Sequence, residues 1–152
     1  MSRAERAKEY FMQGYNCSQA VALAFSDCTG LDEATIGKMM LPYGGGLGRL
    51  RLTCGAVSGM AAVIGLIFGA AKPDSENKKE TYAIVQELCG KFKTENGSLL
   101  CEELLSGAHL NVQVGGEAET RTPEYYKKRP CAELVYHAAE ILENYLNERG
   151  IH

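Results

Sequence analysis

The sequence has no marked excess of charge of either sign. Over 152 residues it contains 16 lysines and arginines against 19 aspartates and glutamates, so its formal net charge is −3. Proteins that hold a nucleic-acid backbone or an anionic membrane surface normally carry a clear basic excess. We therefore expect neither nucleic acid nor a membrane surface as a partner.

The N-terminus lacks the uninterrupted apolar run of a secretory signal. Residues 1–14, MSRAERAKEYFMQG, mix charged and apolar residues instead. We expect the protein to stay in the cytoplasm. Its length of 152 residues and its 45% hydrophobic content suit a single core, which predicts one domain over residues 1–152.

Alternating polar and apolar runs, which are typical of strands, are also nearly missing. Apolar residues recur at spacings of three and four, and stop signals separate the segments. This pattern predicts helices over 3–13, 16–30, 32–42, 54–69, 75–94, 98–107 and 130–146. Residues 111–123 carry two glycines and little to bury, so we expect a mobile surface connection there. The predicted fold class is all-α, an irregular multi-helix bundle around a small-residue-rich central helix.

No two cysteines form a C-x-x-C pair, although the chain has six of them: Cys17, Cys28, Cys54, Cys89, Cys101 and Cys131. The common spacings of zinc ribbons, thioredoxins and ferredoxins are therefore absent. A reducing compartment also argues against a structural disulfide framework. Any site that the cysteines share must be assembled by the fold.

What the sequence does have is an unusual stretch from Tyr43 to Ala71, YGGGLGRLRLTCGAVSGMAAVIGLIFGAA. A phosphate-binding loop is one interpretation. However, Arg51 stands where the dinucleotide pattern has its last glycine, no Walker lysine is present, and the preceding segment is predicted to be helical.

A membrane span is a second interpretation, because residues 52–71 contain no charge over 20 positions. This run is rich in small residues rather than in large apolar ones. Small residues at a spacing of four also let helix backbones approach closely inside a soluble bundle. We favour a buried central helix.

The third interpretation is a thiol held at the start of that helix. Cys54 is predicted to lie in the first turn, where the helix dipole and free N–H groups favour the thiolate. Arg49 and Arg51 precede it and would add to the effect. We therefore expect a lowered pKa for Cys54. The sequence also predicts that Gly45, Gly46, Gly48 and Arg49 would contact a bound cofactor, the glycines by letting backbone N–H groups approach the sulfur atoms.

Four of the cysteines occur in an order that resembles a known family. Cys17 lies in NCSQAV, Cys54 in CGAVSG after GGGLGR, Cys101 in NGSLLCEELL, and Cys131 in RPCAELV. Over about residues 15–139 this order is similar to the redox-active proteins named for the pattern C_GCAxxG_C_C. The chain departs from that pattern because glycine follows Cys54 rather than preceding a cysteine there. The resemblance implies a redox role for the four cysteines, with an iron–sulfur cluster as the leading cofactor.

The resemblance thus makes Cys17, Cys54, Cys101 and Cys131 the predicted catalytic and metal-ligating residues. Three of them fall in or just before a first helical turn, and Cys101 is predicted to lie one turn into its helix. Cys28 is on the same helical face as Cys17 but about 16 Å further along the axis, so one small centre cannot include both. Cys28 and Cys89 lie on apolar stripes and are expected to fill the core.

Several functions stay open at this point. Four thiolates suit an iron–sulfur cluster or tetrahedral zinc, and a metal-free dithiol needs only two of them. The redox alternatives require an electron-transfer or thiol-reductant partner protein. In a different class, the chain is a protein-interaction module without redox activity. Tyr125 and Tyr126, with the basic residues after them, are either a docking patch or a basic approach to the last helix.

Overall fold

Helices form almost all of the regular structure in this computed structural model, which describes residues 1–152. The only β-type pairing in the chain is an isolated antiparallel bridge between Thr53 and Leu100. The all-α prediction is confirmed. The helices are α1 (Arg3–Met12), α2 (Cys17–Leu23), α3 (Ser26–Thr29), α4 (Glu33–Met40), the 3-10 helix η1 (Leu41–Tyr43), α5 (Gly44–Leu47), α6 (Gly55–Phe68), α7 (Ser75–Asn96), α8 (Cys101–Gly107), α9 (Pro123–Lys128) and α10 (Cys131–Glu148).

Side-chain caps fix where several of these helices begin. Asn16 accepts a hydrogen bond from the backbone of Gln19, whose side chain in turn accepts one from the backbone of Asn16. This capping box satisfies two N–H groups at the start of α2. Asp74 caps α7 in a similar way. Thr122 caps α9, a helix that is absent from the prediction, although a cap followed by proline is a local start signal.

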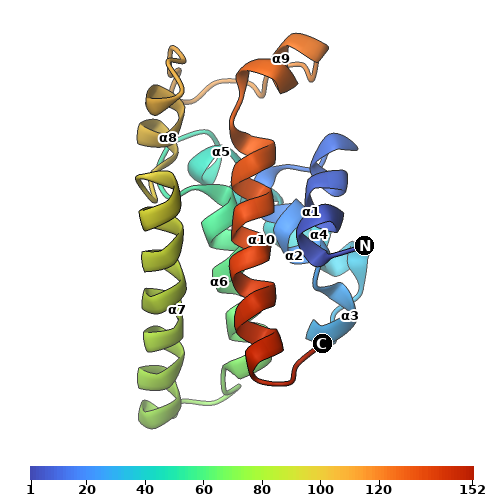
Figure 1. The fold of residues 1–152 in the computed structure, drawn as a ribbon, viewed down its shortest axis with the longest axis vertical. Coiled ribbons are helices and arrows are strands. Elements are labelled where there is room, and N and C mark those ends of the chain that lie inside the picture. The colour runs from blue at the N-terminus through green and yellow to red at the C-terminus, as the bar shows by residue number, and fades with distance from the viewer.

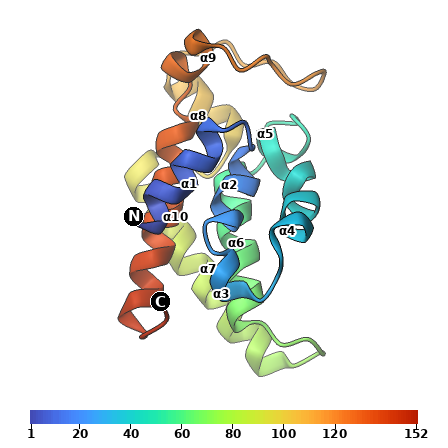
Figure 2. The same ribbon diagram turned by 90° about the vertical axis from the view of Figure 1, so that its right-hand side faces the viewer.

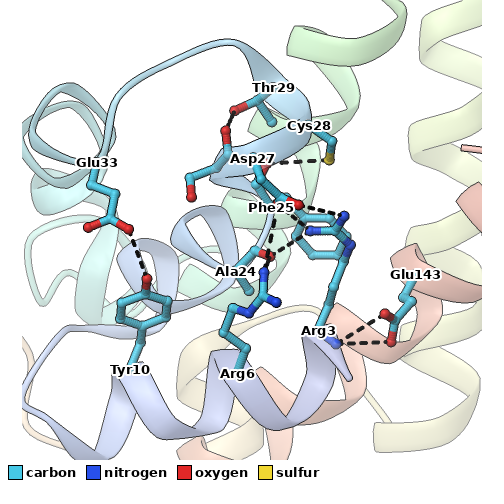
Figure 3. A network of polar contacts seen from close by, with 11 residues as sticks. Arg3, Arg6, Tyr10, Ala24, Phe25, Asp27, Cys28, Thr29, Glu33 and Glu143 are labelled. Atoms are coloured by element: carbon cyan, nitrogen blue, oxygen red, sulfur yellow. Dashed lines mark hydrogen bonds and ion pairs between the residues drawn. The ribbon is translucent and has the colours of Figure 1, made fainter. Parts of the chain in front are cut away.

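The predicted helix over 16–30 is wrong, because the chain breaks at Phe25 into α2 and α3. Phe25 has φ −115° and ψ 14°, outside the helical region. The guanidinium group of Arg3 donates a 3.0 Å hydrogen bond to the carbonyl oxygen of Ala24 and a 2.6 Å bond to Asp27 (Figure 3). These bonds satisfy the carbonyl group at the break, so α1 holds the two short helices at their junction.

The elements pack around α6, whose first half is buried between α2, α7 and α10 (Figure 1). The helix α1 packs against α10 on the side away from α7, and Figure 2 shows α4 lying beyond α2. The predicted small-residue central helix is thus present, but its second half is not fully surrounded, since Leu66 is 37% exposed. No helix in the chain combines the length and apolar character needed to cross a membrane.

Glycine lets α2 and α6 approach closely. A Cβ atom at Gly59 would lie 2.7 Å from the carbonyl oxygen of Ser18 and 3.1 Å from the Cβ atom of Val21. Both values are shorter than ordinary contacts, so any side chain here would push the helices apart. This packing sets the position of the start of α6 relative to the start of α2.

We predict that Gly59→Ala lowers the free energy of unfolding by about 1–3 kcal/mol, because it overpacks the contact between α2 and α6. The matched control is Gly65→Ala in the same helix, where an added Cβ meets no atom within 4 Å. That change should raise stability by up to about 1 kcal/mol, since alanine favours helix more than glycine does. Urea unfolding followed by circular dichroism measures both. Equal effects of the two substitutions would contradict this account of the packing.

Candidate cysteine centre

Four cysteines stand at the starts of four helices. Cys17, Cys101 and Cys131 are the first residues of α2, α8 and α10, and Cys54 is the N-cap of α6. The prediction that Cys101 lies one turn into its helix is wrong, because α8 begins at Cys101 rather than at residue 98. All four cysteines line one cavity of about 60 Å³. Their separation in sequence is therefore bridged by the fold.

Glycines bring two of these cysteines against neighbouring backbone. A Cβ atom at Gly55 would lie 3.1 Å from the Cβ atom of Cys17, and one at Gly46 would lie 2.7 Å from the Cβ atom of Cys101. Gly46 also has φ 72°, in the left-handed region that glycine adopts freely. The glycines before and after Cys54 are thus required by packing against the other cysteines.

Cys28 and Cys89 do not line the cavity. Both are half-buried against the hydrophobic core, and the Cys28 thiol donates a 3.3 Å hydrogen bond to the carbonyl oxygen of Phe25. Burial raises the pKa of each. Their positions agree with the core-filling role that their apolar stripes indicated.

Within the cavity, Cys17 and Cys131 form an interacting pair. Interaction with the Cys131 side chain raises the pKa of Cys17 well above its usual value, and burial acts in the same direction. The same interaction lowers the pKa of Cys131, and Arg129, Arg121 and Arg51 lower it further, while burial opposes them. When one proton leaves the pair, the negative charge therefore resides on Cys131.

The expected low pKa of Cys54 is wrong. Burial raises the pKa of this thiol to about 12. The backbone N–H groups of Ala56 and Val57 favour the thiolate, as predicted for a helix start, but they do not offset the loss of hydration. Cys54 therefore carries its proton at neutral pH, and the favoured thiolate is at the start of α10 rather than α6.

Arg51 reaches the cavity, but it contacts Cys101 rather than Cys54, the thiol that the sequence analysis paired with it. Its guanidinium group donates to the Cys101 sulfur at 3.6 Å. Burial nevertheless raises the pKa of Cys101, and Arg51 only reduces that effect. Arg51 also donates to the carbonyl oxygen of Gln113 at 2.9 Å, which ties the chain after α8 to the site.

The four predicted cofactor-binding residues separate into two groups. Gly45 and Gly46 line the cysteine cavity, whereas Gly48 and Arg49 lie outside it. Arg49 instead bonds to the carbonyl oxygen of Glu117 and lies 3.9 Å from the carboxylate of Glu119. Gly45, Gly48 and Arg49 all line an adjoining groove of about 330 Å³.

Three further residues of the cavity wall were not assigned to it from the sequence: Arg121, Tyr125 and Arg129. Arg121 donates to the carbonyl oxygens of Phe11 and Tyr15, at 3.0 and 3.1 Å. It thereby fastens the connection between α8 and α9, which crosses the molecule above α5 (Figure 2). Of these three residues, Arg129 is the one that a local signal could have found, because it lies two residues before Cys131 in the sequence.

The donor chemistry of the cavity suits a metal that prefers sulfur. Four thiols line it, and no histidine, aspartate or glutamate does. However, no three histidine, cysteine, aspartate or glutamate side chains are grouped so as to hold one metal ion. The residues thus match an iron–sulfur cluster or zinc in ligand type, but they form no single-ion site as they stand.

The fold and this centre define an all-α protein with four cysteines gathered at helix starts around a common cavity. A model of the family described as "Putative redox-active protein (C_GCAxxG_C_C)" matches residues 15–145. The chain belongs to this family of redox-active proteins. Comparison with curated proteins and with solved structures gave no match.

We predict that Gly46→Ala disrupts the centre, because its Cβ atom would lie 2.7 Å from Cys101 Cβ and 2.8 Å from Arg51 Cα. The matched control is Gly48→Ala, which has a similar φ of 56° but no atom closer than 3.9 Å to the added Cβ. The control should lose about 1–2 kcal/mol of stability from backbone strain alone. Gly46→Ala should lose about 1–3 kcal/mol more through overpacking. Equal losses in urea unfolding would show that the glycine is needed only for its φ angle.

Proposed function

We propose that this protein is a thiol–disulfide redox protein whose reactive pair is Cys17 and Cys131. The observation that carries the proposal is that both thiols line one small cavity, at the starts of two helices that pack against each other, and that each shifts the pKa of the other. A disulfide requires two cysteines that the fold already holds near each other, and these two positions meet that requirement. The membership of the chain in a redox-active family supports this assignment.

The reaction is an exchange of disulfides. The Cys131 thiolate attacks one sulfur atom of a substrate disulfide, which forms a mixed disulfide and releases the first substrate thiolate. Cys17 then loses its proton and attacks the Cys131 sulfur, which forms the Cys17–Cys131 disulfide and releases the second thiolate. Two electrons pass to the substrate, and its two thiolates take up protons. A dithiol of a reductant partner protein reverses these steps and restores the pair.

The surroundings favour Cys131 as the attacking group. It is the cavity cysteine whose pKa is lowered, whereas burial keeps Cys54 and Cys101 protonated. Arg129 and Arg121 stabilise its negative charge. In a reducing compartment such as the cytoplasm, the pair would rest as a dithiol, ready to reduce a substrate.

A second candidate is a redox protein that holds an iron–sulfur cluster on Cys17, Cys54, Cys101 and Cys131. The observation that favours it is that all four line one cavity without any other usual metal ligand. A bound cluster would supply one-electron transfer, and Arg51 would offset its negative charge. Zinc on the same residues would instead give a module without redox activity.

We predict a two-electron, two-thiol redox step for the reduced, metal-free protein, measured by counting free thiols across a series of dithiothreitol redox buffers. Cys17→Ser and Cys131→Ser should each abolish the step, because either change leaves one partner alone. Cys28→Ser and Cys89→Ser are matched controls, since these thiols lie outside the cavity and should leave the step intact. The proposal fails if the wild-type protein shows no such step while its circular dichroism shows a folded protein.

Anaerobic purification followed by elemental analysis and visible absorption separates the candidates. Iron and sulfide with a brown colour would contradict the dithiol proposal and support the iron–sulfur cluster. Zinc at one equivalent, together with the absence of redox activity, would contradict the dithiol proposal and support the zinc-holding module. Absence of metal with a titrating thiol pair is the result that we expect.

A further inference from the structure

The groove beside the cysteine cavity is lined by four arginines. Arg49, Arg51, Arg121 and Arg129 contribute to its wall, and Glu119 is its only acidic residue. We call this 330 Å³ space the arginine groove. It is large enough for a small organic molecule and strongly positive, because a single carboxylate cannot neutralise four guanidinium groups.

Three of these four arginines are largely withdrawn from water. The side chains of Arg49, Arg51 and Arg129 are only 12%, 5% and 11% exposed. Burial of a guanidinium group is costly unless its charge and its donors are matched. Arg49 leaves its buried Nε atom without a hydrogen-bond partner. Burial of these guanidinium groups beside one carboxylate leaves an excess of positive charge in the groove, which an anion would offset.

The Glu119 carboxylate is the only anionic group in the groove wall, and its contacts indicate which ligand chemistry fits the groove. The Glu119 carboxylate forms an ion pair with Arg129 and lies 3.9 Å from Arg49 and 4.0 Å from Arg51. Three arginines thus already converge on a carboxylate, a geometry that guanidinium groups favour. The Glu119 side chain is 42% exposed, and the free volume of about 330 Å³ beside it leaves room for a second carboxylate.

The groove opens onto the reactive pair. Arg51, Arg121, Tyr125 and Arg129 line both the groove and the cysteine cavity, and so does Gly45. A molecule whose acidic end occupies the groove can therefore direct its other end toward Cys131.

We infer that the arginine groove binds the carboxylate of a small anionic disulfide, which is the substrate class of this protein. The inference rests on the proposed thiol–disulfide function and adds what that function leaves open, namely which disulfides react. Carboxylate binding in the groove orients the substrate, and the Cys131 thiolate attacks its sulfur. A cationic disulfide of similar size is repelled by the same arginines.

The test compares three small symmetrical disulfides: dithiodipropionate, which is dianionic, bis(2-hydroxyethyl) disulfide, which is neutral, and cystamine, which is dicationic. The rate of Cys17–Cys131 disulfide formation is measured with each small disulfide. It is then divided by the rate at which the same disulfide reacts with mercaptoethanol, which corrects for the intrinsic reactivity of that disulfide. We expect dithiodipropionate to exceed cystamine by about tenfold or more after this correction, as electrostatic steering produces.

Arg49→Gln should reduce that preference at least severalfold. Arg49 lines the groove but not the cysteine cavity, so the change spares the contacts of the thiols. The matched control is Arg149→Gln, which removes the same charge at the far end of α10 and should keep the preference. Binding of suberate, a dicarboxylate of similar length without a disulfide, provides a second readout by NMR titration and should also weaken in Arg49→Gln.

The outcomes separate the inference from the proposed function. Equal corrected rates for the three disulfides would overturn the anionic substrate and leave the thiol–disulfide function standing. No reaction with any of them would overturn that function and the disulfide substrate together, and suberate binding would then decide whether the groove binds carboxylates. Failure of suberate to bind would overturn the groove as a carboxylate site.

Discussion

Close approach between backbones, permitted by glycines that have no room for a side chain, is the constraint on which this site depends. Gly59 sets α6 against α2, Gly55 lies against Cys17, and Gly46 lies against Cys101. Each contact places the start of one helix next to the start of another. The glycine-rich stretch that includes α5 and α6 therefore serves the close packing of helices. It is the packing surface around which the cysteines gather.

That packing also decides the chemistry of the thiols. Burial disfavours thiolates, and it overcomes the backbone N–H groups at Cys54 and the arginine at Cys101. Only Cys131 has its pKa lowered, by interaction with the Cys17 side chain and with three guanidinium groups. The cavity thus contains four chemically similar residues, yet their surroundings make one of them the preferred nucleophile. The same arginines extend outward into the groove, so activation of the thiol and selection of substrate share one set of charges.

The sequence predicted whatever depends on local signals. Apolar spacing placed the long helices, and Asn16 marked the start of α2. The four cysteines were selected by a resemblance, and their convergence was only partly supported by their positions near helix starts. The break at Phe25 depends on Arg3, which lies 21 residues from the carbonyl group that it binds, so local periodicity could not reveal it. The role of Arg121 likewise depends on a contact with a residue 110 positions away. The raised pKa of Cys54 follows from burial by other helices, which no local pattern reports.

The most direct test of the central claim is peptide mapping of the disulfide that forms first. The reduced protein is treated with one equivalent of diamide, unreacted thiols are alkylated, and the digest is analysed by mass spectrometry. The account predicts a single linkage between Cys17 and Cys131, with Cys28 and Cys89 alkylated. A first linkage between any other pair, or full alkylation of all six cysteines, would contradict it.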